Sequence, residues 1–181
     1  MSGVTGLPLP AVDATVAPRI RPATAEDAPA LAGIYAHYVE HSVATFDLEA
    51  PDAAWWAAKL ADLAAAGWPF LVAEDDEGVA GYAYVAPWRI KPAYRQTVED
   101  TIYLAPGRTG RGTGRALLGA LLDAARAAGV RQVVAVVTDS GDPSSLRLHA
   151  ALGFVEAGRL RAVGMKHGRW LDTLLLQADL T

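Results

Sequence analysis

The hydrophobic pattern of the chain switches repeatedly between the two-residue period of strands and the helical period of about 3.6 residues. Helices are expected to begin at the capping-box-like residues 24–27 and to cover residues 52–66, 113–128 and 144–152. Strands are expected over residues 19–22, 70–74, 79–87, 97–104, 132–137, 155–161 and 171–177.

The order of these elements indicates the fold class. The strands over 70–74 and 79–87 flank residues 75–78, which predicts a hairpin with a turn longer than two residues. The helix over 113–128 is long enough to connect two parallel strands. We therefore expect an α/β fold, a single-domain three-layer sandwich around a mixed sheet.

Composition narrows the possible functions. The 181 residues suit one domain, and a hydrophobic fraction of 52% supplies a core. The net charge of −4 argues against a general nucleic-acid-binding surface, and no apolar run approaches the ~20 residues that span a membrane. The chain has no cysteine, which excludes disulfides, thiolate metal sites and a cysteine nucleophile.

The first 18 residues differ from the rest. They contain three prolines and one charged side chain, Asp13, and lack the basic start and unbroken apolar stretch of a secretory signal. We interpret residues 1–18 as a flexible tail of a cytoplasmic protein, and residues 19–181 as the folded domain.

Glycines and arginines concentrate between the strand over 97–104 and the helix that follows it. Gly110, Gly112 and Gly114 would let a ligand approach the backbone, beside helix amides that lack internal partners. Positive charge is supplied by Arg108, Arg111 and Arg115. A glycine-rich turn before a helix N-terminus is typical of a pyrophosphate site.

Other interpretations of this loop remain open. A nucleoside-triphosphate loop requires Lys where Thr113 stands, and the dinucleotide fingerprint requires one more residue between Gly112 and Gly114. An ordinary flexible loop with helix-capping glycines is the third alternative.

The chain resembles the GNAT-type N-acetyltransferases, in particular the phosphinothricin and methionine sulfoximine acetyltransferase branch. The resemblance covers about residues 19–179. It rests on the segments 37–46, 87–104, 110–118, 146–154 and 166–172. It implies acetyl-CoA as co-substrate, no metal, a mostly antiparallel sheet splayed at the cofactor site, a small amino-acid-like amine as acceptor, and a homodimer.

The resemblance also implies which residues bind acetyl-CoA. Gly112 and Gly114 fall on the glycines of the family's pyrophosphate motif, whereas Thr109 stands where Gln or Arg is usual and Asp142 where Asn is usual. The complete expected set is Ile102, Tyr103, Leu104, Arg108, Thr109, Gly110, Arg111, Gly112, Thr113, Gly114, Arg115, Asp142 and Ser145.

Acetyl transfer to an amine requires a base for the ammonium and an acid for the departing thiolate. Strand alternation places Glu99 on one face of the strand and Asp100 on the core face with Val98 and Ile102. The resemblance implies that Glu99 is the general base and His149 the acid. Asp100 is the alternative base if a bulge rotates the strand, and a solvated strand carboxylate or a surface histidine is the plain alternative for either residue.

The acceptor site is expected at the loop before this strand. Arg89 and Lys91, beside Trp88 and Tyr94, suit the anionic end of an amino-acid-like substrate, with Phe46 as a wall of the pocket. A solvated basic loop is the alternative. Two other functions also stay open: acetylation of protein or peptide amines, and a non-catalytic acyl-CoA-binding module.

Overall fold

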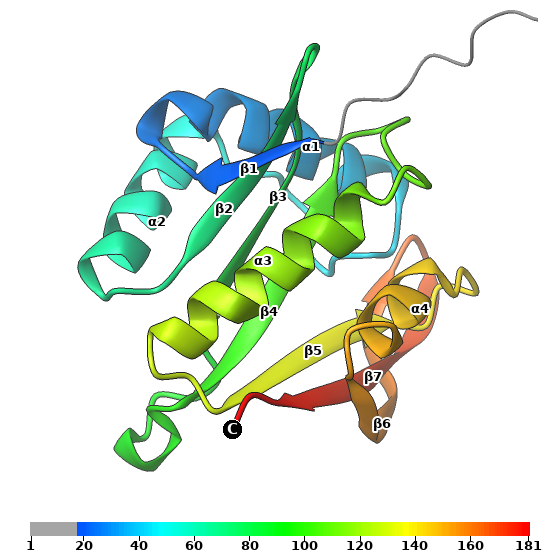
Figure 1. The fold of residues 1–181 in the computed structure, drawn as a ribbon. Helices are drawn as coiled ribbons and strands as arrows, with labels where there is room; N and C mark the ends of the chain where they lie inside the picture. The colour runs from blue at the N-terminus through cyan, green and yellow to red at the C-terminus, as the bar shows by residue number, and fades with distance from the viewer. Residues whose placement is uncertain (1–17) are drawn as a thin grey trace, which may run out of the picture.

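The computed structural model describes residues 18–181 (Figure 1). Its helices are α1 (Ala28–His41), α2 (Ala53–Ala65), α3 (Thr113–Ala127) and α4 (Ser144–Ala150), with short 3-10 turns η1 (Ala25–Asp27) and η2 (Pro92–Tyr94). Its strands are β1 (Arg19–Pro22), β2 (Phe70–Asp75), β3 (Gly78–Pro87), β4 (Thr97–Leu104), β5 (Gln132–Thr138), β6 (Val155–Lys166) and β7 (Arg169–Asp179). The expected tail, apart from Pro18, lies outside the described residues.

The seven strands form one sheet in the order β1-β2-β3-β4-β5-β7-β6. All neighbouring strands are antiparallel except β4 and β5, which α3 connects as a parallel pair. The predicted mixed, mostly antiparallel sheet is therefore confirmed. No helix of the described residues is long and apolar enough to cross a membrane.

Helices cover both faces of the sheet, as the three-layer prediction requires (Figure 1). Strand alternation sends neighbouring side chains into different cores. In β2, Val72 packs with the buried residues of α1 and α2, whereas Ala73 packs with those of α3. The Val72 core is rich in aromatic rings, and the Ala73 core is mainly aliphatic.

Three local expectations are corrected. The β2–β3 hairpin has a two-residue turn, because the strands extend to Asp75 and Gly78, which pair with each other. The bulge considered for β4 is absent, because its ladder with β3 runs without a register shift from Val98 to Leu104. The long hairpin of β6 and β7 also extends well beyond the predicted strands, reaching Lys166 and Arg169.

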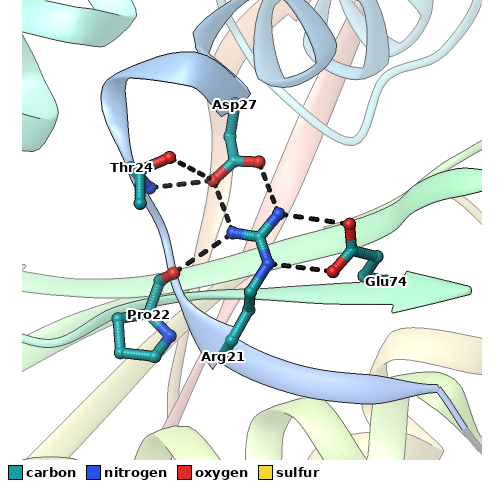
Figure 2. Close-up of polar contacts among 5 residues, drawn as sticks. All are labelled: Arg21, Pro22, Thr24, Asp27 and Glu74. Atoms are coloured by element: carbon teal, nitrogen blue, oxygen red, sulfur yellow. Dashed lines mark hydrogen bonds and ion pairs between the residues drawn. The ribbon is translucent and has the colours of Figure 1, made fainter.

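Arg21 ties β1 to its neighbours through one guanidinium group (Figure 2). Its Nη1 and Nη2 donate to the two carboxylate oxygens of Asp27 at 2.8 Å each, and its Nε donates to Glu74 at 3.0 Å. Asp27 also accepts from the backbone N–H of Thr24 at 2.8 Å, which closes the predicted capping box. The Arg21 guanidinium holds the pKa of Asp27 below its ordinary value. This network fixes the entry of α1 and does not contribute to the cavity described below.

Candidate functional site

The sheet opens between β4 and β5. Their parallel pairing covers only Thr97–Glu99 and ends at the pair Glu99–Val134. Beyond that point β4 stays paired with β3 as far as Leu104, and β5 stays paired with β7 as far as Thr138. The two strand edges therefore diverge without hydrogen bonds to each other. The splay that the resemblance implied is present, on the β5 side of β4.

A cavity of about 1070 Å³ occupies this opening. It is lined by β4 from Glu99 to Leu104, by β5 from Ala135 to Thr138, by the glycine loop, by α4 and by residues 41–46. Of the predicted site residues it brings together Phe46, Glu99, Ile102, Tyr103, Leu104, Thr109, Gly110, Gly112, Gly114, Arg115, Asp142, Ser145 and His149. A cavity of this size is at the upper end of the range for small-molecule sites.

Glu99 stands where the strands separate. It is the last residue of β4 that pairs with β5, and its side chain is half-buried on the face that carries Thr101 and Tyr103. Burial raises the pKa of Glu99 and the charge of Asp100 raises it further, while Arg89 and Lys59 partly oppose the shift. A carboxylate with a raised pKa at the edge of a cavity suits a general base.

Asp100 points to the opposite face and contacts His149. The carboxylate Oδ2 lies 3.1 Å from His149 Nε2, and both side chains are buried. On the other side of the ring, His149 Nδ1 lies 2.7 Å from the backbone oxygen of Ser145. Asp100 therefore occupies the core face that the sequence predicted, with a partner that strand alternation alone could not identify.

The glycine loop forms one end of the cavity. Gly107, Gly110 and Gly112 adopt left-handed conformations with φ of 78°, 76° and 82°, which other residues adopt at a cost. α3 begins directly after Gly112, so its first amides point to the cavity. A Cβ atom at Gly114 would lie 3.4 Å from both Leu104 and Leu148, so the helix packs closely on β4 and α4. These features fit the pyrophosphate of a coenzyme A thioester.

The three predicted arginines of the loop take different positions. Arg115 lines the cavity, whereas Arg108 and Arg111 do not. Arg108 turns back to the β2–β3 hairpin, where its guanidinium pairs with Asp75 and donates to Glu77 at 2.6 Å. Arg108 therefore anchors the loop to the hairpin in this structure. Thr113 is buried as the first residue of α3 and does not line the cavity.

Asp142 binds the first residue of α4, the helix that carries His149. Its carboxylate accepts from the backbone N–H and the hydroxyl of Ser144, each at 2.9 Å. These two donors lower the pKa of Asp142. Asp in place of the Asn usual in the family thus keeps a local role at the start of α4, and its negative charge lines the cavity.

The predicted acceptor loop lies outside the cavity. Trp88, Arg89, Lys91 and Tyr94 do not line it, and Arg89 stacks on the Trp88 ring at 4.1 Å. Arg89 is nevertheless close enough to lower the pKa of Glu99. Because Ala86 of β3 pairs with Glu99, the loop that follows β3 begins close to Glu99, and direct substrate contact by its residues stays a prediction.

Residues 41–46 form another wall of the cavity, and three residues not singled out in the sequence hold it. Tyr38 donates its hydroxyl to the backbone oxygen of Leu104 at 2.7 Å, linking α1 to β4. Tyr35 is hydrogen-bonded to Thr45 at 2.7 Å. The buried ammonium of Lys166 donates to the backbone oxygen of Thr45 at 2.9 Å. A lysine at the end of a strand normally indicates a surface position, so the sequence carried no signal for this contact.

Comparison with known proteins extends the resemblance. The model of the acetyltransferase (GNAT) domain family matches residues 20–175. The chain is 47% identical over 155 residues to the phosphinothricin N-acetyltransferase of Alcaligenes faecalis, covering 86% of this chain and 79% of that protein. It is 38% identical over 165 residues to the L-methionine sulfoximine/L-methionine sulfone acetyltransferase of Salmonella typhimurium, covering 89% and 94% respectively.

Solved structures give the same result. The phosphinothricin acetyltransferase of Sinorhizobium meliloti, in complex with acetyl-CoA, superimposes with a TM-score of 0.86 at 42% identity, covering 91% of this chain and 89% of that chain. These similarities span nearly all of the described residues and confirm the resemblance drawn from the sequence segments.

Proposed function

Because the chain belongs to the GNAT family of acetyltransferases, we propose that it transfers an acetyl group from acetyl-CoA directly to the amino group of a small amino-acid-like substrate. Acetyl-CoA supplies the activated thioester. The observation that carries the proposal is the position of Glu99 at the point where β4 and β5 separate, in a cavity that the glycine loop and residues 41–46 also line.

Each demand of acetyl transfer has a candidate group in the cavity. Glu99 accepts the ammonium proton through a water molecule, so that the amine becomes a nucleophile. Backbone amides near Tyr103, with that of Leu104 on the β4 edge that faces the splay, polarise the thioester carbonyl. His149 donates a proton to the departing thiolate. The amides at the start of α3, with Arg115, hold the pyrophosphate.

The acceptor is proposed from two sources. Relatives are named for phosphinothricin and for methionine sulfoximine or sulfone, which are amino acids with a tetrahedral phosphorus or sulfur group. We propose that Arg89, whose charge acts on the pKa of Glu99, and Lys91, two residues further along the loop, bind the anionic end of such a molecule.

A substrate panel tests the proposal. Purified protein is incubated with acetyl-CoA and phosphinothricin, methionine sulfoximine, methionine sulfone, common amino acids, or a peptide with free N-terminus and lysine, and thiol release is recorded. Because the chain has no cysteine, the protein itself contributes no thiol signal. We expect turnover with the sulfoximine or phosphinothricin. Preferential peptide acetylation would instead support a protein acetyltransferase, and tight acetyl-CoA binding without turnover on any amine a binding module.

We also expect a homodimer in the cytoplasm. Exposed apolar side chains on the β6–β7 hairpin support the dimer, among them Met165 and Trp170, which are 58% and 67% exposed. Light scattering of the purified chain tests this; a monomer at micromolar concentration would contradict it.

A further inference from the structure

The imidazole of His149 is held between two acceptors. A backbone carbonyl can only accept, so Nδ1 must carry a hydrogen to bond Ser145 at 2.7 Å. The Asp100 carboxylate also accepts when ionised, so Nε2 carries a hydrogen as well. A ring that donates from both nitrogens is the imidazolium cation. The structure is therefore consistent with a buried ion pair of His149 and Asp100.

The two contacts of the ring are unequal. The 2.7 Å bond of Nδ1 to Ser145 is short, whereas the 3.1 Å contact of Nε2 to Asp100 exceeds the roughly 2.7–2.9 Å of strong charge-assisted bonds. The Nδ1 proton is thus retained, and the Nε2 proton is the one available for transfer. The edge of the Phe154 ring, with centroids 4.9 Å apart, packs against the imidazole and limits its rotation.

Asp100 uses only one of its two carboxylate oxygens, Oδ2, to contact His149. Its Oδ1 is buried and has no hydrogen-bond partner among the described residues. Within the same residues, no other charged or titratable side chain forms a hydrogen bond or ion pair with the His149 ring; Glu99, the neighbouring carboxylate, lies on the other face of β4. Both Asp100 and His149 line the cavity.

We infer that Asp100 is a positioning residue that keeps His149 doubly protonated and holds its Nε2 proton until His149 donates this proton to the sulfur of the departing coenzyme A. This inference rests on the proposed acetyl transfer. In the proton transfer, the Nε2–H bond of His149 breaks and an S–H bond forms. The imidazolium becomes a neutral imidazole whose Nδ1–H remains hydrogen-bonded to the Ser145 carbonyl. The carboxylate of Asp100 then faces an unprotonated Nε2. Its negative charge favours uptake of a proton from solvent by His149, which restores the ion pair.

The electrostatics of the pair agree with this role. Burial lowers the pKa of His149, but the hydrogen bond and charge of Asp100 and the Ser145 carbonyl outweigh burial, so the net shift is upward. His149 therefore stays protonated to a higher pH than an unperturbed imidazole would. Asp100 also raises the pKa of Glu99, so one carboxylate influences both the base and the acid of the reaction.

Substitution of Asp100 by Asn tests the inference with little change in shape. The control is Asp123→Asn, which removes a charge from an exposed position on α3. The imidazole C2–H signals are titrated by proton NMR, and the His149 signal is identified by its absence in His149→Gln. The chain has only four histidines, which keeps the spectrum simple. This measurement needs no substrate and stays informative if the proposed function fails.

We expect the wild-type His149 signal to titrate above the ordinary value of about 6.5, and Asp100→Asn to lower the midpoint by one unit or more. The pH profile of kcat should move to lower pH on both limbs, because Asp100 raises the pKa of both Glu99 and His149. At pH 8 the variant should lose about tenfold or more in kcat, with smaller loss at pH 6. Asp123→Asn should match the wild type.

A wild-type His149 that titrates below 6.5 overturns the inference, whether or not Asp100→Asn folds. An unshifted midpoint in a folded Asp100→Asn variant, or equal losses of kcat at all pH values, overturns it too. A normal titration shift without amine turnover in the wild type would leave the ion pair intact and instead contradict the proposed function.

Discussion

The ring of Phe46 lies directly over the Cα atom of Gly164, and a Cβ atom at position 164 would overlap three of its ring carbons. Phe46 belongs to the wall of the cavity, whereas Gly164 belongs to the distant strand β6. Because Gly164 has no side chain, the Phe46 ring can pack directly on its backbone. This contact sets the position of the ring in the cavity wall. Gly164 therefore influences the lining of the cavity without lining it, at the position predicted for the acceptor.

Gly164→Ala should displace Phe46 and raise KM for the amine acceptor, with little effect on KM for acetyl-CoA. Gly158→Ala is the matched control, because it lies on the same strand and a Cβ there would meet no atom within 4 Å. Neither glycine has a positive φ, so backbone strain does not separate the two variants. Steady-state kinetics with both substrates varied measures the effect. Equal KM values in the two variants would show that Phe46 does not shape the pocket.

Lys166 provides a second connection between β6 and the same wall. Its Nζ reaches the backbone oxygens of Thr45 at 2.9 Å and Tyr38 at 3.5 Å, and the side chain is buried. Lys166→Met keeps the apolar stem and removes the donor, so we expect a higher KM for the acceptor and an unchanged KM for acetyl-CoA. A rise in both constants would indicate a general loss of structure.

The ionisation of Lys166 gives a stability prediction as well. Burial lowers its pKa below the ordinary 10.5. Between the lowered value and 10.5 the unfolded chain binds more protons than the folded one, so this group makes unfolding free energy rise with pH in that window. Urea denaturation should show that the free energy of unfolding of the wild type, compared with that of Lys166→Met, increases from pH 7 to pH 10. The exposed Lys91→Met is the control and should show no such gain.

Local sequence was sufficient for most elements. The bounds of β1 and β4 agree with the prediction, those of α3 and β5 differ by one residue at one end, and those of α2 differ by one residue at each end. Capping residues, glycines and alternation act over short distances, which explains this agreement. The end of β6 was missed because this edge strand is exposed along most of its length and shows no alternating pattern. Strand alternation also placed Asp100 correctly on the core face.

Contacts between distant segments could not be predicted in the same way. The Asp100–His149 pair joins residues 49 apart, and Lys166 and Thr45 are 121 apart. Arg108 was expected at the pyrophosphate, yet it pairs with Asp75, because a hairpin carboxylate lies within its reach. Composition at the loop indicates a positive site, but only the fold decides which arginines face the cavity.

Glu99→Gln should lower kcat by about 10²–10⁴-fold at pH 7, the usual contribution of a general base. Burial raises the pKa of Glu99, so the fraction of active carboxylate in the wild type grows as pH rises through that raised value. Above pH 9 the acceptor amine loses its proton unaided, and the gap between wild type and variant should narrow. The exposed Glu49→Gln serves as control.

Measuring acetyl-CoA binding as well as kcat in Glu99→Gln separates a loss of the chemical step from a loss of cofactor binding. Acetyl-CoA affinity, measured by calorimetry, should be little changed in Glu99→Gln, because the cofactor contacts are predicted along the glycine loop and at Ile102–Leu104 of β4, beyond Glu99. A rate equal to wild type at pH 7 would remove Glu99 from the mechanism.

Gly112→Asp should raise KM for acetyl-CoA, because it places a carboxylate at the start of α3 where the helix amides face the cavity. Gly129→Asp is a close control: it also has a left-handed φ, 86° against 82°, and follows the C-terminus of the same helix. Both variants carry the same charge change and similar backbone strain, of about 1 kcal/mol. Only Gly112→Asp should weaken acetyl-CoA binding, by roughly tenfold. Added salt should reduce the difference in KM between the two variants, because it screens the repulsion between the new carboxylate and the phosphates. Equal effects of the two variants on KM would mean that strain in α3, and not charge at the loop, governs cofactor affinity.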